Sequence, residues 1–216
     1  MSTENKLTVK VCGMKYTDNR RALEILPIDI FGFIFYPPSP RFVNPADLYN
    51  LRNLTGTQKK KAGVFVDSTA DHIMEIIQLA GLSHIQLHGC ETPGFCDQIR
   101  KTRVSVIKTF RVDDQFDFST TEPYIEAVDY FLFDTRADKA GGTGKKFNWP
   151  VLEKYDLNVP FFLSGGIDPS DAKSIKILNH PMLIGIDLNS GFEDVPGVKN
   201  FEKLNNFLDM ILNFKP

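Results

Sequence analysis

VDYFLFDTRADKAGGTGKKFNW, residues 128–149, joins a short apolar run to a glycine-rich loop through a single carboxylate. The run Tyr130–Phe133 is rich in aromatic residues and too short for a good helix, so it predicts a buried β-strand. Asp134 follows at the carboxyl end of that strand, which is where α/β folds place their chemistry. The glycines at 141, 142 and 144 can bring backbone N–H groups close to an anionic ligand. This stretch therefore predicts an α/β fold with a site at the carboxyl ends of its strands.

On both sides of this stretch the chain alternates strand-like and helix-like segments. Strict alternation predicts parallel strands joined by right-handed crossovers, and eight such units in 216 residues close into a single (β/α)₈ barrel. We expect one domain spanning residues 1–216; the alternative is an open doubly wound sheet, which usually needs fewer strands. The expected strands are 7–12, 29–35, 61–66, 83–87, 104–110, 130–134, 159–163 and 182–187. The expected helices are 17–26, 45–54, 67–80, 92–101, 114–127, 149–155, 169–178 and 198–212.

Composition narrows the class of partner and the compartment. The net charge is −2 and no basic tract is present, so we expect no nucleic-acid partner. No apolar run approaches the roughly 20 residues of a membrane span, and residues 1–10 show no leader pattern. The three cysteines, Cys12, Cys90 and Cys96, form neither a disulfide framework nor a metal motif. We therefore expect a cytoplasmic protein.

The alternation of side chains along each strand tests the barrel interpretation. One parity is apolar, as in Val9 and Val11 or Ile184 and Ile186, and we expect that side to pack against helices. The other parity faces the barrel interior and ends, in four strands, on a polar or reactive residue: Cys12, His88, Asp134 and Asp187. We therefore expect the polar or reactive side chains of four strand ends to lie together at one mouth of the barrel.

Cys12 and Asp134 are the candidate reactive groups. A free cysteine is usually a packed small hydrophobe, but the ammonium of Lys10 on the same face would stabilise a thiolate that acts as a base or nucleophile. Asp134 could equally cap its loop or pair with Arg136 or Lys139. To act as a general acid it needs a pKa raised by burial or by a neighbouring anion.

Two further glycine sites predict phosphate binding. Ser164-Gly165-Gly166 follows the seventh strand and Asn189-Ser190-Gly191 follows the eighth. Loops at these positions bind phosphate in many barrels through N–H groups and a helix N-terminus. The loop containing Gly142 could close over the same ligand, although each glycine pair alone could simply form a turn.

Arg41 follows the stiff segment Pro37-Pro38-Ser39-Pro40. A fixed guanidinium could hold a carboxylate in a bidentate fork, whereas the alternative is a solvated surface arginine. His88 could be a core histidine with satisfied hydrogen bonds. A zinc site has little support, because His84 and His88 lie four apart on a strand rather than on one helical turn.

Taken together, these residues resemble the phosphoribosylanthranilate isomerase family of tryptophan biosynthesis. The resemblance extends over nearly the whole chain, in order. The segments that carry it are KVCGM (10–14), FYPPSPRFV (35–43), AGVFV (62–66), IQLHG (85–89), Asp134, GGTGKKFNW (141–149), LSGGI (163–167) and IDLNSGFE (186–193).

The resemblance implies a cofactor-free and metal-free (β/α)₈ barrel that performs an Amadori rearrangement. The aminoaldose N-(5-phospho-ribosyl)anthranilate would become the aminoketose 1-(2-carboxyphenylamino)-1-deoxyribulose 5-phosphate. Cys12 would be the general base, Asp134 the general acid, and Arg41 the anchor of the anthranilate carboxylate. Amides around Gly165, Gly166, Ser190 and Gly191 would hold the phosphate, with Asp187 lining the site and Gly142 as a further substrate-binding residue. The implied partner is a phosphorylated small molecule, and we expect a monomer or homodimer.

Two alternatives remain at this point. The related isomerase of histidine biosynthesis performs the same chemistry on an aminoimidazole, but that family resembles a two-carboxylate design with Asp where Cys12 stands. A non-catalytic barrel that binds a phosphorylated ligand would keep the glycine loops and would need neither Cys12 nor Asp134.

Overall fold

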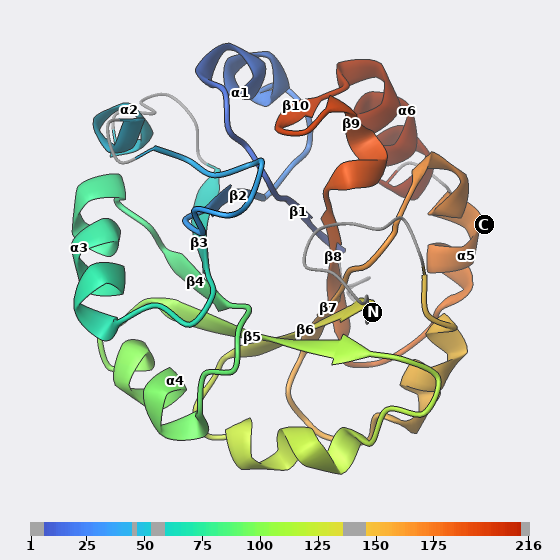
Figure 1. The fold of residues 1–216 in the computed structure, drawn as a ribbon. Coiled ribbons are helices and arrows are strands. Elements are labelled where there is room, and N and C mark those ends of the chain that lie inside the picture. The colour runs from blue at the N-terminus through green and yellow to red at the C-terminus, as the bar shows by residue number, and fades with distance from the viewer. Residues whose placement is uncertain (1–6, 45–46, 53–58, 136–145, 213–216) are drawn as a thin grey trace, which may run out of the picture.

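The eight strands close into a parallel barrel in chain order, with no strand inserted out of sequence. The computed structural model describes residues 7–44, 47–52, 59–135 and 146–212. Figure 1 looks into the ring of strands, with the helices arranged around its outside. The strands are β1 (Thr8–Val11), β2 (Ile30–Ile34), β3 (Lys60–Phe65), β4 (His84–Leu87), β5 (Ser105–Val112), β6 (Tyr130–Thr135), β7 (Phe161–Leu163) and β8 (Leu183–Leu188). The barrel predicted from the alternation is therefore confirmed.

The outer layer contains both α-helices and shorter 3₁₀ segments. The hydroxyls of Thr69 and Thr92 cap two of the helices by accepting backbone N–H groups from the first turn. The α-helices are α1 (Thr17–Leu23), α2 (Leu48–Arg52), α3 (Ala70–Ala80), α4 (Pro93–Arg100), α5 (Ala172–Ile177) and α6 (Phe201–Leu212). The 3₁₀ segments are η2 (Phe118–Tyr124), η3 (Trp149–Lys154), η4 (Pro169–Asp171) and η5 (Ser190–Phe192).

The ring closes where β1 pairs with β8. In this register Lys10 lies opposite Asp187 and Val11 opposite Leu188. Beyond the strand, the N–H of Cys12 donates to the carbonyl of Leu188 at 2.8 Å. The closing seam thus brings the first and last strands of the chain together at the carboxyl end of the barrel, which an open sheet would not do.

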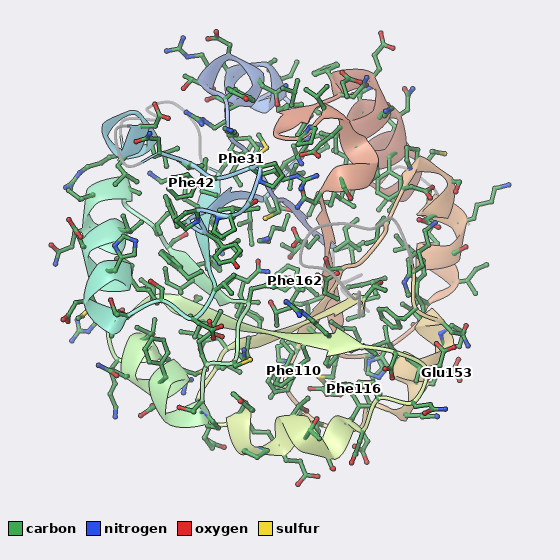
Figure 2. All side chains as sticks on the ribbon, in the orientation of Figure 1. Phe31, Phe42, Phe110, Phe116, Glu153 and Phe162 are labelled. Carbon is green, nitrogen blue, oxygen red and sulfur yellow. The ribbon has the colours of Figure 1, made fainter. Side chains whose placement is uncertain are left out.

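The expected division into inner and outer side chains holds for most strands. Val9 and Val11 belong to the large core between strands and helices, whereas the interior of the barrel contains a separate small cluster: Ile30, Ala62, Ile107, Leu132 and Phe162. Figure 2 labels Phe162 near the middle of the ring. Ile184 departs from the expectation, because it packs against the interior cluster rather than with Ile186 in the outer core. The pairing of β7 with β8 shifts register at Phe161 and Phe162, and this irregularity changes the parity of β8.

The last helix begins three residues later than expected. Val198–Lys199 forms a short strand, β10, which pairs antiparallel with β9 (Glu193–Val195) instead of opening the helix. Gly197 turns the chain between them with φ of 88°, a conformation that favours glycine. This hairpin lies above the barrel end at which the candidate site lies, and it brings two further charged residues there. No helix in the described part of the chain is both long and apolar enough to cross a membrane.

Replacing Gly185 by alanine should destabilise the barrel. A Cβ at this position would lie 2.5 Å from the carbonyl oxygen of Thr8 and 2.6 Å from the ring of Phe162, so backbone or core must shift. Overpacking of this kind costs about 1–3 kcal/mol of unfolding free energy, measurable by urea denaturation.

Gly94→Ala is the matched control, since a Cβ there would meet no described atom within 4 Å. Gly94 lies in α4, where alanine should be neutral or raise the unfolding free energy by about 0.5–1 kcal/mol. Equal effects of the two substitutions would contradict the packing at the closing seam.

Candidate active site

The predicted site residues lie on strand ends and loops at one end of the barrel. Cys12 follows β1, Asp134 lies on β6 and Asp187 on β8. Arg41 lies in the loop after β2, and the remaining predicted residues follow β7 and β8: Gly165, Gly166, Ser190 and Gly191. Gly142 and the rest of the GGTG loop lie outside the described residues. The carboxyl ends of five parallel strands or their loops thus contribute to one mouth, as the sequence predicted.

Lys10 and Asp187 form a buried ion pair beneath this mouth. The Lys10 ammonium lies 2.9 Å from Oδ1 of Asp187, with side chains that are 0% and 5% exposed. Burial alone would lower the pKa of Lys10, but the charges of Asp187 and Cys12 raise it above its ordinary value, so the lysine remains protonated. Two opposite charges therefore lie side by side below Cys12 and Asp134.

Cys12 is almost completely buried, and the charge of Lys10 acts on its thiol. Gly32 makes this packing possible, because a Cβ there would lie 2.9 Å from both Cα and Sγ of Cys12. Burial raises the pKa of the Cys12 thiol, and Asp187 adds to this, while Lys10 and Lys199 act in the opposite direction. Lys10 favours the thiolate, as expected, but desolvation of the thiolate outweighs the lysine and Asp187 compensates its charge, so the pKa of Cys12 is raised overall.

Asp134 faces His88 across the mouth. Oδ2 of Asp134 lies 3.6 Å from Nε2 of His88, and Oδ1 accepts the backbone N–H of Thr135 at 2.9 Å. On its other side, the His88 ring accepts a hydrogen bond from the amide of Gln86 at 3.0 Å, and Gln86 also donates to Thr109. With Nδ1 as acceptor, neutral His88 carries its proton on Nε2, facing the carboxyl group.

The surroundings of Asp134 give it the property required of a general acid. Burial, together with the nearby charge of Asp187, raises the pKa of Asp134 to about 6. Burial, with the charges of Arg111, Lys10 and Lys108, lowers the pKa of His88 to about 4, so His88 is neutral near pH 7. His88 therefore offers an N–H donor to Asp134 without adding a positive charge that would keep the carboxyl group ionised.

The glycine loops after β7 and β8 pack tightly where the sequence predicted phosphate binding. Gly165 and Gly166 have φ of 90° and 68°, a backbone conformation that favours glycine. A Cβ on Gly165 would overlap the backbone and hydroxyl of Thr135 and would lie 2.9 Å from Oδ1 of Asp134. A Cβ on Gly191 would overlap the carbonyl oxygen of Ile167, so the two loops are in contact, and the loop after β7 packs against Asp134.

Arg41 is buried, and its guanidinium is paired with Glu193. The guanidinium Nε lies 2.9 Å and 3.0 Å from the two Glu193 oxygens, and Nη2 lies 2.6 Å from Oε2. The loop that carries Arg41 is held to β2, because the N–H of Val43 donates to the carbonyl of Ile34 at 2.9 Å. The alternative of a solvated surface arginine is therefore excluded.

Sequence reasoning missed Glu193 and Lys199 as members of the site. Lys199 is 0% exposed in its side chain, and its ammonium lies 2.6 Å from Oε1 of Glu193. Glu193 lies on β9 and Lys199 on β10, and the residues of β10 were expected to begin the last helix. The dipeptide Pro196-Gly197 between Val195 and Val198 is a turn signal that could have revealed the hairpin.

Comparisons with known proteins identify one family. Residues 9–210 match the family model described as N-(5′-phosphoribosyl)anthranilate (PRA) isomerase. A relative from Parabacteroides distasonis named N-(5′-phosphoribosyl)anthranilate isomerase is 44% identical over 210 residues, which cover 96% of this chain and 94% of the relative. The crystal structure of phosphoribosyl anthranilate isomerase from Thermotoga maritima is 29% identical, with a TM-score of 0.86 over 96% of this chain and 100% of that one. A further crystal structure is of a phosphoribosyl anthranilate isomerase in complex with reduced 1-(o-carboxyphenylamino)-1-deoxyribulose 5-phosphate. That protein is 27% identical, with a TM-score of 0.83 over 96% of this chain and 100% of that one.

Asp134→Asn should stabilise the protein in a pH-dependent way. Folding raises the pKa of Asp134 to about 6, so ionisation of the carboxyl group opposes folding above pH 6 and has no effect below about pH 4. The asparagine removes this cost. The gain in unfolding free energy should be about 1–3 kcal/mol at pH 7.5 and should shrink as the pH falls from 6 to 4.

Chemical denaturation at a series of pH values measures this difference, with the exposed Asp156→Asn as the control for loss of a charge. A gain that is independent of pH, or one that appears only below pH 4, would contradict the assigned surroundings of Asp134.

Proposed function

The chain belongs to the N-(5′-phosphoribosyl)anthranilate isomerase family, and we propose that Asp134 and Cys12 are the general acid and general base of its reaction. The reaction is the Amadori rearrangement of N-(5-phospho-ribosyl)anthranilate to the corresponding aminoketose in tryptophan biosynthesis. Family membership decides against the histidine-pathway isomerase and against a non-catalytic binding barrel. The observation that carries the assignment is the raised pKa of Asp134 on β6, on the mouth that also holds buried Cys12.

Asp134 acts first in the proposed mechanism. Its carboxyl proton passes to the furanose ring oxygen, the bond between that oxygen and C1 breaks, and the substrate nitrogen takes up the positive charge as a protonated Schiff base. The carboxylate left behind accepts the backbone N–H of Thr135 and faces the Nε2 of His88. These N–H donors stabilise the Asp134 carboxylate as it forms in the transition state, and this lowers the barrier to ring opening.

Cys12 then acts as the base. Its thiolate removes the proton from C2, the electron pair moves to the Schiff base, and the resulting enolamine tautomerises to the ketone. Burial raises the pKa of the Cys12 thiol, so the thiol releases its proton to solvent before the thiolate can act. The cation formed on the substrate supplies the charge that favours the thiolate at the moment when it is needed. The substrate nitrogen is the electron sink throughout.

Two anchors hold the sugar between these groups. We propose that Arg41 binds the anthranilate carboxylate and that the amides of Gly165, Gly166, Ser190 and Gly191 bind the phosphate. The positive φ angles of the β7 loop glycines and the contact between the two loops support the phosphate assignment. Asp187 is paired with Lys10, so its proposed contribution is electrostatic, through Lys10 and Asp134, rather than by direct contact with the ligand. Fixing both ends of the substrate limits the motion of C1 and C2 between acid and base.

Cys12→Ala should abolish turnover without abolishing binding. Removal of a general base typically costs a factor of about 10²–10⁴ in kcat. Substrate fluorescence measures turnover, and calorimetry with the reduced product analogue should show affinity within a few-fold of the wild type. The exposed Cys90→Ala is the control and should keep full activity. A Cys12→Ala enzyme with near wild-type kcat would reassign the base.

Arg41→Ala should act mainly on KM. Loss of a charge-assisted bidentate contact to a remote carboxylate weakens binding of substrate and transition state together, by about 10- to 100-fold. The exposed Arg21→Ala is the control and should leave KM unchanged. A fall in kcat at constant KM would show that Arg41 acts on the reacting atoms instead of the carboxylate.

A further inference from the structure

Glu193 is a buried carboxylate that the proposed chemistry does not use. Its side chain is 4% exposed, and burial alone would raise its pKa, yet Arg41 and Lys199 hold the pKa of this carboxyl group below its usual range. The N–H of Gly197 also donates to Oε1 at 3.0 Å. Glu193 is thus an ionised group with several partners, in a protein where a buried charge is costly unless it is paired.

Among the residues that the structure describes, Glu193 is the only carboxylate bonded to Arg41, and it uses one edge of the guanidinium. Glu193 is bonded to Nε and Nη2, the edge nearest the side-chain stem. A planar guanidinium has a second edge, formed by Nη1 and Nη2, that matches a carboxylate equally well. Holding the first edge fixes the plane and direction of the second.

Lys199 connects this contact to the rest of the mouth. Its ammonium donates to Oε1 of Glu193 at 2.6 Å and to the side-chain oxygen of Asn189 at 2.7 Å, immediately before the loop proposed to bind phosphate. Its backbone N–H and carbonyl are both bonded to Asn19 of α1, at 2.8 Å each. The ammonium therefore has little freedom to move.

Arg41 and Lys199 pack against Gly13, the residue that follows Cys12. Gly13 has φ of 77°, and a Cβ there would lie 2.7 Å from Cδ of Arg41, 2.8 Å from Oδ1 of Asn189 and 3.3 Å from Nζ of Lys199. The backbone after Cys12 is thus in contact with both Arg41 and Lys199. Two cations and one carboxylate leave the cluster Arg41–Glu193–Lys199 with one positive charge in excess, which suits an anionic ligand.

We propose, on the basis of the function proposed above, that Glu193 is a positioning residue: tied to Lys199, it orients the second edge of Arg41 toward the carboxylate of the substrate. Glu193 acts through Arg41 and does not touch the substrate. It makes recognition of the carboxylate depend on a fixed guanidinium rather than on a mobile positive charge.

A comparison of two ligands tests this role. The first is the reduced product analogue that carries the carboxylate, and the second is the same compound built on aniline, without the carboxylate. For the wild type, omission of the carboxylate should weaken binding by about 10- to 100-fold, as expected for a charge-assisted contact. For Glu193→Gln, the ratio of the two dissociation constants should fall below about 5, while the aniline compound binds as it does to the wild type.

Control variants separate this effect from loss of charge or loss of fold. Glu202→Gln removes the same charge from an exposed position at the start of α6 and should keep the wild-type ratio. If Glu193→Gln does not fold, Glu193→Asp retains the charge but withdraws it by one methylene, and the ratio should again fall. A wild-type ratio in the folded Glu193 variant overturns the proposal. A larger ratio also overturns it, because Glu193 would then compete with the ligand for Arg41.

The ratio of the two dissociation constants for the wild type tests the role of Arg41 separately from the role of Glu193. If the wild type binds both compounds equally, the assignment of Arg41 as carboxylate anchor fails, and the role of Glu193 fails with it. If the wild type prefers the carboxylated compound and Glu193→Gln does so equally, only the role of Glu193 fails.

Discussion

The buried ion pair between Lys10 and Asp187 is the interaction on which the rest of the site depends. It forms at the seam where β1 meets β8, because the closing register places these two residues opposite each other. Each charge makes the burial of the other tolerable, and neither would persist alone in the barrel interior. In an open sheet the first and last strands would lie apart and this pair would not exist. Barrel closure therefore determines the electrostatics of the mouth as well as its shape.

The ion pair and burial together give the proposed acid, Asp134, and the proposed base, Cys12, different proton affinities. Burial and Asp187 raise the pKa of Asp134 to about 6, and neutral His88 faces it without opposing this shift. Burial raises the pKa of Cys12 as well, but Lys10 and Lys199 act against it, so a cation on the substrate can complete the formation of the thiolate. Environments that separate the proton affinities of two groups are the usual way in which one site provides both an acid and a base. Because Asp134 ionises unfavourably in the folded protein, this pair of environments lowers the unfolding free energy near neutral pH.

Strand periodicity was sufficient to predict the barrel and to bring Cys12 and Asp134 to one mouth, because a parallel strand alternates its two faces and all eight carboxyl ends meet at one edge. It failed at Ile184, where a register shift between β7 and β8 changes the face of a side chain without any local sequence signal. It also missed Glu193 and Lys199. Glu193 contacts Arg41, about 150 residues away, and Lys199 contacts Glu193 from a hairpin whose local mark is the turn at Pro196-Gly197. Secondary-structure propensity reflects residues that are near one another in the chain. These contacts instead depend on how barrel closure brings distant loops together.

We propose that a thiol and a carboxyl group act on the same sugar from the closed mouth of this barrel. A crystal structure of the protein with the reduced product analogue tests it most directly. We expect Sγ of Cys12 within about 3.5 Å of C2, and a carboxyl oxygen of Asp134 within hydrogen-bond reach of the oxygen that comes from the furanose ring. The carboxylate of the analogue should bind Arg41, and its phosphate should bind the loops after β7 and β8. A ligand bound in this pocket with either group out of reach of those atoms would contradict it.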